Sequence, residues 1–234
     1  MYPMNKNESL SPFILASVSP RRRELLERLG VGFEVMAAGV VEQEDGAMEP
    51  RAMVLHNAAL KAAWVCARRS GAWVLAADTA VALPGEGERA GEVLNKPRDL
   101  EEARGMLRKL SGRTHVVYTG VCLWRRPGGP EITHCETSAV TFQVLDEARI
   151  EAYLARVNPL DKAGAYGIQE GRELILARYA GSFTNIMGLP LEWLAARLQE
   201  LALIPGGVVP TLGDLRFLDD TAEAIGPDPV HPPA

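Results

Sequence analysis

The chain has few of the residues from which zinc centres and histidine-assisted nucleophiles are built. Its 234 residues include three cysteines and four histidines. Cys66, Cys122 and Cys135 are odd in number and lack metal-ligand spacing, and the histidines are scattered. The sequence therefore predicts no zinc site, and no histidine stands out as the partner of a catalytic serine or cysteine.

A long apolar run is also missing. The N-terminus reads MYPMNKNESLSP, without the charged start and apolar stretch of a signal peptide, and no window reaches the length of a membrane span. The net charge of −5 argues against general affinity for nucleic acid. We therefore expect a protein of the reducing cytoplasm that binds neither membranes nor nucleic acid.

Composition divides the chain into three segments. Residues 1–12 are expected to form a flexible N-terminus, residues 13–203 a folded domain, and residues 204–234 a tail rich in proline and glycine. We expect this tail to be largely disordered, although Leu215, Phe217 and Leu218 could dock on the domain.

Apolar runs alternate with helical stripes along the domain. Strands are expected at 13–16, 73–77 with a continuation at 80–83, 115–124, 131–144 and 174–179. Helices are expected at 20–29, 50–68, 100–110, 146–157 and 190–203. The sequence PGGP at 127–130 predicts a hairpin between two of the strands. This pattern predicts an α/β fold with a mixed, partly antiparallel sheet flanked by helices.

Three consecutive arginines occupy the first turn of the first expected helix. Ser19 suits its N-cap, and Arg21, Arg22 and Arg23 follow directly. Cations are unfavourable there, by about 0.3–1 kcal/mol each, because free backbone N–H groups already make the helix start positive. The cluster is explained if an anion such as phosphate binds at the helix start. The alternative is that the arginines only point into solvent.

Asp78 interrupts the apolar run WVLAADTAVAL, where an unpaired carboxylate would be costly. It must therefore lie at a strand end, bind a cation or be hydrogen-bonded. We expect a strand end, because ligands of open α/β sheets bind at the carboxyl ends of strands. The structural alternative is an Asx turn through Thr79.

Three more charged residues have ordinary interpretations when each is taken alone. Lys61 shares the apolar face of an expected helix with Asn57, where a lysine usually extends its charged end to solvent. Lys96 precedes Pro97 on an expected loop, and Glu42 belongs to the acidic segment VVEQED. Only a shared site would give these residues another role.

The segment DKAGAYGIQ at 161–169 combines glycines with one cation, one ring and one amide. Glycines allow a backbone to approach a ligand closely, Tyr166 could pack on a base or sugar, and Gln169 could read a base edge. The alternative is a tight turn between a helix and a strand. Together, these carboxylates, cations and glycines favour metal-assisted attack of water on a phosphoanhydride.

As a set, the motifs resemble the Maf family of nucleoside triphosphate pyrophosphatases. The resemblance extends from Ile14 to about Leu198. It rests on LASVSPRRRELL, the Glu42-Gln43 pair, Lys61-Ala62, ADT at Asp78, LNKPRD at Lys96, LSGRTH at Ser111, DKAGAYGIQ, and GLPL at Gly188. The segment DKAGAYGIQ is similar to the corresponding segment of the family branch that acts on dTTP and UTP.

The resemblance implies hydrolysis between the α and β phosphates, giving a nucleoside monophosphate and pyrophosphate. It also implies a divalent metal, Mg²⁺ or Mn²⁺, an elongated mixed sheet with two lobes around a nucleotide-binding cleft, and a homodimer. Asp78 would be the general base and, with Glu42, a metal ligand, while Lys61 and Lys96 would complete the catalytic cleft. The residues expected to bind or select the nucleotide are Ser17, Arg21, Arg22, Thr79, Lys162 and Gln169.

Two positions in the domain depart from the family pattern. Ala77 replaces the glycine usual before the Asp-Thr pair, and Val41 stands where an acidic residue often precedes Glu42. Two other functions stay open: a pyrophosphatase for modified or other nucleotides, and a nucleotide-sensing protein that affects cell division. The four charged residues of the expected catalytic cleft argue against a sensor, because a sensor needs no base.

Overall fold

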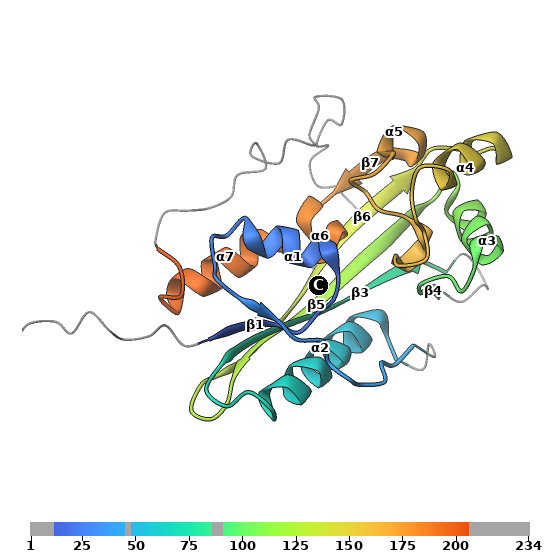
Figure 1. Ribbon diagram of the computed structural model, residues 1–234. Helices are drawn as coiled ribbons and strands as arrows, with labels where there is room; N and C mark the ends of the chain where they lie inside the picture. The colour runs from blue at the N-terminus through green and yellow to red at the C-terminus, as the bar shows by residue number, and fades with distance from the viewer. Residues whose placement is uncertain (1–11, 45–47, 86–90, 206–234) are drawn as a thin grey trace, which may run out of the picture.

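A seven-stranded mixed sheet forms the centre of the molecule (Figure 1). The computed structural model describes residues 12–44, 48–85 and 91–205. The strands are β1 (Phe13–Leu15), β2 (Glu34–Val35), β3 (Trp73–Leu83), β4 (Glu92–Leu94), β5 (Thr114–Arg125), β6 (Glu131–Phe142) and β7 (Leu176–Ala180). Their order is β2-β1-β3-β5-β6-β7, and β4 also pairs with β3. β1 is parallel to β2 and β3, and the other pairs are antiparallel, which confirms the predicted α/β fold with a mixed sheet.

Helices cover both faces of this sheet. They are α1 (Pro20–Glu27), α2 (Pro50–Cys66), α3 (Leu100–Leu110), α4 (Glu147–Leu154), α5 (Arg172–Ile175), α6 (Phe183–Met187) and α7 (Leu191–Glu200), with a 3₁₀ turn η1 at Ala163–Ala165. In Figure 1, α2 lies on one face, against β3 and β5, and α1, α6 and α7 lie on the other. No helix in the described ranges is long and apolar enough to cross a bilayer.

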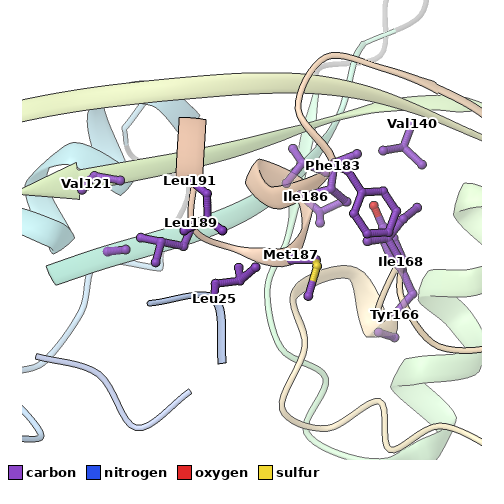
Figure 2. Close-up of a cluster of buried hydrophobic side chains, with 14 of the residues drawn as sticks. Leu25, Val121, Val140, Tyr166, Ile168, Phe183, Ile186, Met187, Leu189 and Leu191 are labelled. Atoms are coloured by element: carbon purple, nitrogen blue, oxygen red, sulfur yellow. The ribbon is translucent and has the colours of Figure 1, made fainter. Parts of the chain in front are cut away.

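Side chains of β3 alternate between two apolar cores, as the period of a strand requires. Ala76 belongs to the core beneath α2, whereas Leu75 belongs to the larger core on the opposite face. Figure 2 shows part of this larger core, to which Leu25 of α1, Phe183 of α6 and Leu191 of α7 contribute side chains. By the same alternation, consecutive residues of β3 face different layers.

One edge of β3 is only partly covered. β5 pairs with residues 73–82 of β3, while on the other edge β1 pairs with residues 73–75 and β4 with residues 81–83. Within the described ranges, no strand pairs with residues 76–80 along that second edge. This gap gives Asp78 and Thr79 access to one edge of the sheet although their side chains point to opposite faces.

The structure corrects two predictions about strands. β3 continues without a break through Asp78 and Thr79, so neither the predicted strand end nor the alternative Asx turn exists there. The strand predicted at 174–179 begins at Leu176, because left-handed Gly171 (φ 59°) introduces the short helix α5. β2, β4, α5 and α6 were not predicted. The predictions for residues 1–11 and for most of the C-terminal tail, 206–234, lie outside the described residues.

Candidate active site

A cavity of about 240 Å³ opens at the gap in the edge of β3. The chain following β1, the middle of β3, the loop following β4 and the glycine-rich segment 161–169 form its walls. All ten site residues predicted from the sequence line it: Ser17, Arg21, Arg22, Glu42, Lys61, Asp78, Thr79, Lys96, Lys162 and Gln169. The structure therefore brings together side chains that lie up to 152 positions apart in the chain.

Asp78 is held inside β3 by hydrogen bonds and an ion pair. Its Oδ1 accepts from the Lys61 Nζ at 3.0 Å, and its Oδ2 accepts from the Asn57 amide at 2.9 Å. Burial alone would raise the pKa of the Asp78 carboxyl, but Lys61, Arg22 and the hydrogen bonds outweigh it and hold that pKa below its usual value. The carboxyl group is therefore ionised at neutral pH.

Helix α2 supplies the groups that hold Asp78. Asn57 and Lys61 are four residues apart and so share one helix face. Gly120 of β5 is the sheet partner of Asp78, and a Cβ at Gly120 would lie 2.4 Å from the backbone oxygen of Val54 in α2. A residue without a side chain is required at this position, because α2 approaches the sheet closely here and places Asn57 and Lys61 beside Asp78.

Lys61 does not extend to solvent, as an isolated lysine on an apolar face usually does. The side chain is buried, and its Nζ lies between two carboxylates, 2.7 Å from the Glu42 Oε2 and 3.0 Å from the Asp78 Oδ1. Glu42 and Asp78 therefore lie close together, because both carboxylates contact the Lys61 ammonium group. A buried charge paired in this way is costly to leave with one partner removed.

Asn57 was missed as a site residue by sequence reasoning. Its amide also bonds both backbone groups of Gln43, accepting from the N–H at 2.9 Å and donating to the C=O at 3.0 Å. Asn57 therefore fixes the loop that carries Glu42 as well as the carboxylate of Asp78. The available signal was a polar residue one turn before Lys61 on the same apolar face.

The three arginines of α1 have different surroundings. Arg21 donates to Asp161, and Arg22 donates to the Gly188 carbonyl at 2.9 Å, whereas Arg23 forms an exposed pair with Glu27. Only the first two line the cavity, so the anion-binding interpretation stays a prediction for them, while the solvent-facing alternative describes Arg23. Ser19 occupies the N-cap position, but its side chain makes no capping hydrogen bond.

Thr79 is part of an ordered hydrogen-bond chain behind the cavity. Its hydroxyl accepts from Arg22 at 2.9 Å and lies 3.0 Å from the Thr119 hydroxyl, which donates to the Asn185 carbonyl. Since the Thr119 proton goes to that carbonyl, Thr79 donates to Thr119 and accepts from Arg22. Thr79 therefore helps to hold the Arg22 guanidinium, and Thr119 and Asn185 are further supporting residues that the sequence did not reveal.

The glycine-rich segment is packed from beneath and presents Gln169 to the cavity. The Tyr153 hydroxyl bonds both backbone groups of Gly167, and a Cβ at Gly167 would lie 2.8 Å from the Lys162 side chain. Gln169 donates to Glu170 at 2.8 Å, while its buried Oε1 has no partner among the described residues. Gln169 therefore lines the cavity with an acceptor that is unpaired within the described ranges but buried.

Tyr166 belongs to the same wall. The neighbouring Ile168 and Tyr166 lie in the larger apolar core (Figure 2), and the Tyr166 hydroxyl meets the His115 ring nitrogen at 2.8 Å. Burial lowers the pKa of His115 to about 3 and raises that of Tyr166 well above its usual value. Both groups are therefore neutral at physiological pH and act as part of the scaffold.

The charges of the cavity suit a polyphosphate. Five cations and three carboxylates line it, a net charge of +2. No cluster of three acidic, histidine or cysteine side chains occurs within the described ranges. Glu42 and Asp78 nevertheless provide the oxygen ligands that Mg²⁺ and Mn²⁺ prefer, and Mg²⁺ is commonly held by one or two carboxylates plus substrate phosphates. This pair therefore fits a divalent ion that binds together with the nucleotide.

Comparison with known proteins identifies close relatives. A family model described as Maf-like protein matches residues 12–201. A protein of Myxococcus xanthus (strain DK1622) named dTTP/UTP pyrophosphatase is 46% identical over 200 residues, which cover 86% of this chain and 96% of the relative. Proteins with the same name from Moorella thermoacetica (strain ATCC 39073 / JCM 9320) and Anaeromyxobacter sp. (strain Fw109-5) are 46% and 48% identical; the matches cover 84% and 80% of this chain and 96% and 88% of those relatives.

Proposed function

The chain belongs to the Maf-like family, and from that premise we propose that it hydrolyses dTTP and UTP between the α and β phosphates. The products are the nucleoside monophosphate and pyrophosphate. The observation that carries the proposal is the cavity in which an ionised Asp78 lies among Arg21, Arg22 and Lys96. The names of the similar proteins, dTTP/UTP pyrophosphatase, support the choice of substrate.

Asp78 is the general base of the proposed reaction. Water attacks a phosphorus atom of the α–β anhydride, the P–O bond of the bridge breaks, and one water proton passes to the Asp78 carboxylate. Lys61 and Asn57 fix the direction of that carboxylate. The arginines and Lys96 neutralise the phosphates and the charge that develops on the leaving pyrophosphate.

Glu42 and Asp78 would hold the divalent ion, Mg²⁺ or Mn²⁺. The ion would neutralise phosphate charge and polarise the attacked phosphoryl group. A nucleoside triphosphate carrying one such ion has a net charge of about −2, opposite to the +2 of the cavity lining. Charge matching therefore supports a metal–nucleotide complex as the substrate.

Gln169 selects the base in this proposal. Uracil and thymine present an N3–H donor between two carbonyl acceptors, so a site that reads them needs both an acceptor and a donor. The Oε1 of Gln169, unpaired but buried, supplies the acceptor and the NH₂ group supplies the donor once the side chain turns from Glu170 into the cavity. The extra methyl group of thymine is apolar and is only weakly discriminated, so both pyrimidines are accepted.

Pyrophosphate release with each nucleotide tests the proposal directly. Purified protein with Mg²⁺ or Mn²⁺ is assayed against dTTP, UTP, CTP, ATP, GTP and modified nucleotides. The proposal predicts the highest kcat/KM for dTTP and UTP and no activity after chelation of the metal. Preference for a purine or modified nucleotide would support the rival pyrophosphatase, and tight binding without turnover would support a nucleotide sensor.

Two properties of the whole protein belong to the same proposal. We place it in the cytoplasm, where its substrates are made; the three free and buried cysteines are compatible with a reducing compartment. We also expect a homodimer, as the family resemblance implies. Cell fractionation and light scattering test these two expectations.

A further inference from the structure

Arg21, in the first turn of α1, is bound to Asp161 at the start of the glycine-rich segment. Arg21 donates through one terminal nitrogen to the Asp161 Oδ2 at 2.8 Å and through the other to the Asp161 backbone oxygen at 3.2 Å. The two residues are 140 positions apart in the chain, and both line the cavity. A guanidinium group held at two points has a fixed plane.

The other carboxylate oxygen of Asp161 is held by Lys162. The Lys162 Nζ lies 2.9 Å from the Asp161 Oδ1 and 2.8 Å from the Asn158 carbonyl oxygen, with the Glu170 carboxylate at 3.6 Å. The Lys162 side chain is only 5% exposed. Its ammonium group is thus largely committed to acceptors of the protein, and one of these bonds fixes Asp161.

This arrangement differs from an ordinary surface ion pair. Arg23 and Glu27, on the same helix, have side chains 63% and 54% exposed, and such pairs contribute little. Arg21 is 19% exposed and Asp161 43%, and Asp161 also pairs with a buried lysine. The energy of the Arg21 pair is therefore less weakened by water.

We propose that Asp161 is a positioning residue for substrate binding, which sets the plane of the Arg21 guanidinium so that its remaining N–H donors meet the phosphates. Two of the five donors are used by Asp161, and three are left for a ligand. The inference rests on the proposed function only in taking a polyphosphate as the ligand. In this arrangement Lys162 acts through Asp161, which is a different role from the direct substrate contact expected from the sequence.

Removing the Asp161 charge has two opposite effects, and their sizes decide the expected result. The cavity becomes more positive by one unit, which favours phosphates by a few-fold at most for a partly exposed group. Arg21 loses its orientation, and a charge-assisted hydrogen bond to the substrate is worth about ten-fold or more. The loss of orientation is larger, so binding should weaken.

Asp161→Asn tests the proposal, because an asparagine cannot accept from both cations through its side chain. We expect KM for UTP to rise about ten-fold with kcat changed less than two-fold. Arg21→Ala should weaken binding at least as much, and Arg21→Ala/Asp161→Asn should be no worse than Arg21→Ala alone. Glu27→Gln is the matched control, since it removes one carboxylate from the exposed pair of α1.

Calorimetry with inorganic tripolyphosphate provides a readout that does not depend on turnover. Non-additive losses of affinity in the same three variants support the positioning role even if the protein hydrolyses no nucleotide, in which case only the proposed function fails. An unchanged or lower KM for Asp161→Asn, or fully additive losses, would overturn the inference. Arg21→Lys guards against misfolding of the Asp161 variant, because it retains the charge, loses the two-point contact and should reproduce the rise in KM.

Discussion

At the scale of single residues, a carboxylate stands in the middle of a buried strand and is compensated on all sides. Asp78 has a cation on one oxygen and an amide on the other. An uncompensated charge there would be expelled or protonated. The fold instead keeps this carboxylate ionised, because Lys61, Arg22 and the hydrogen bonds outweigh the effect of burial on its pKa, and places it in the wall of a cavity lined by cations.

Replacing Asp78 by asparagine should remove the base while retaining its shape. We expect turnover of UTP to fall roughly 10²–10⁴-fold, because an amide cannot take the proton of the attacking water. The melting temperature should fall, because buried Lys61 loses one of its two carboxylate partners, but the variant should still fold because Glu42 remains and the new amide oxygen can accept from one of the two donors that hold the carboxylate. Glu34→Gln, which changes an exposed acid paired with Arg69, is the control. Near-normal turnover of the Asp78→Asn variant would make this residue structural.

The sequence predicted the members of the site better than their contacts. A carboxylate in an apolar run is anomalous in itself, so Asp78 could be singled out and its need for a partner stated. Asn57 and Thr119 could not, because a polar residue among apolar ones becomes informative only when its partner is known. Likewise, the sequence does not distinguish Arg22 from Arg23. Only the orientation of α1 in the structure places Arg22 in the cavity and Arg23 on the surface.

At the scale of elements, the site depends on how closely α2 packs on the sheet. α2 approaches the sheet closely at Gly120, directly across from Asp78 in the β3–β5 ladder. The periodicity of apolar residues predicts neither the register between two strands nor the distance between a helix and the sheet. Gly120 therefore carried no signal in the sequence, although α2 and β5 were both predicted there.

Gly120→Ala should damage both stability and activity. The new methyl group would lie 2.4 Å from the Val54 backbone oxygen, and backbone cannot move aside as a flexible side chain can. We expect a loss of about 1–3 kcal/mol in the free energy of unfolding, together with lower kcat as α2 carries Asn57 and Lys61 away from Asp78.

Gly105→Ala is the matched control for that substitution. Gly105 lies within α3, and nothing stands within 4 Å of a Cβ built there. Alanine should stabilise this helix by up to about 1 kcal/mol and leave kcat unchanged. Denaturant unfolding and initial rates compare the two variants. Equal effects of the two substitutions would show that close packing at Gly120 is not required.

Long elements were predictable and short ones were not. The stripe of α2 and the apolar runs of β5 and β6 extend over 17, 12 and 12 residues, enough for a period to be recognised. α3 begins after Asp99, whose side chain accepts from the Glu102 N–H as an N-cap does. β2 has two residues and α5 four, too few for any periodicity, and both form because neighbouring elements supply their partners.

At the scale of the whole molecule, a buried histidine links stability to pH. His115 is fully buried, and burial lowers its pKa to about 3, against about 6.5 in the unfolded chain. Between these values the unfolded chain binds a proton that the folded protein does not. The free energy of unfolding should therefore decrease as the pH falls from about 6.5 towards 3, by up to about 1.4 kcal/mol per pH unit from this group.

The contribution of His115 is isolated by comparing how steeply the free energy of unfolding changes with pH, rather than by comparing its absolute value. His115→Gln should flatten the dependence of unfolding free energy on pH between 6.5 and 4, whatever its effect at pH 7. His56→Gln is the matched control, because it removes an imidazole from an exposed position. Urea unfolding at several pH values provides the measurement, and parallel curves for the parent protein and His115→Gln would contradict the assignment.

Base selection is the property in which the whole cavity takes part. The cations proposed to bind the phosphates lie on α1 and after β4, while the proposed base reader, Gln169, lies on the glycine-rich segment. Cytosine reverses the donor and acceptor at N3 and N4 relative to uracil, so it would leave polar groups unpaired at Gln169. The parent protein should therefore hydrolyse UTP with a markedly higher kcat/KM than CTP.

Gln169→Ala should narrow the ratio of kcat/KM for UTP to that for CTP. Its affinity for inorganic tripolyphosphate should stay nearly constant, because the amide does not contact the phosphates in the proposed mode. Equal rates on CTP and UTP in the parent protein would refute base reading by this segment. An unchanged ratio of UTP to CTP kcat/KM in the variant would assign base reading to another residue of the cavity.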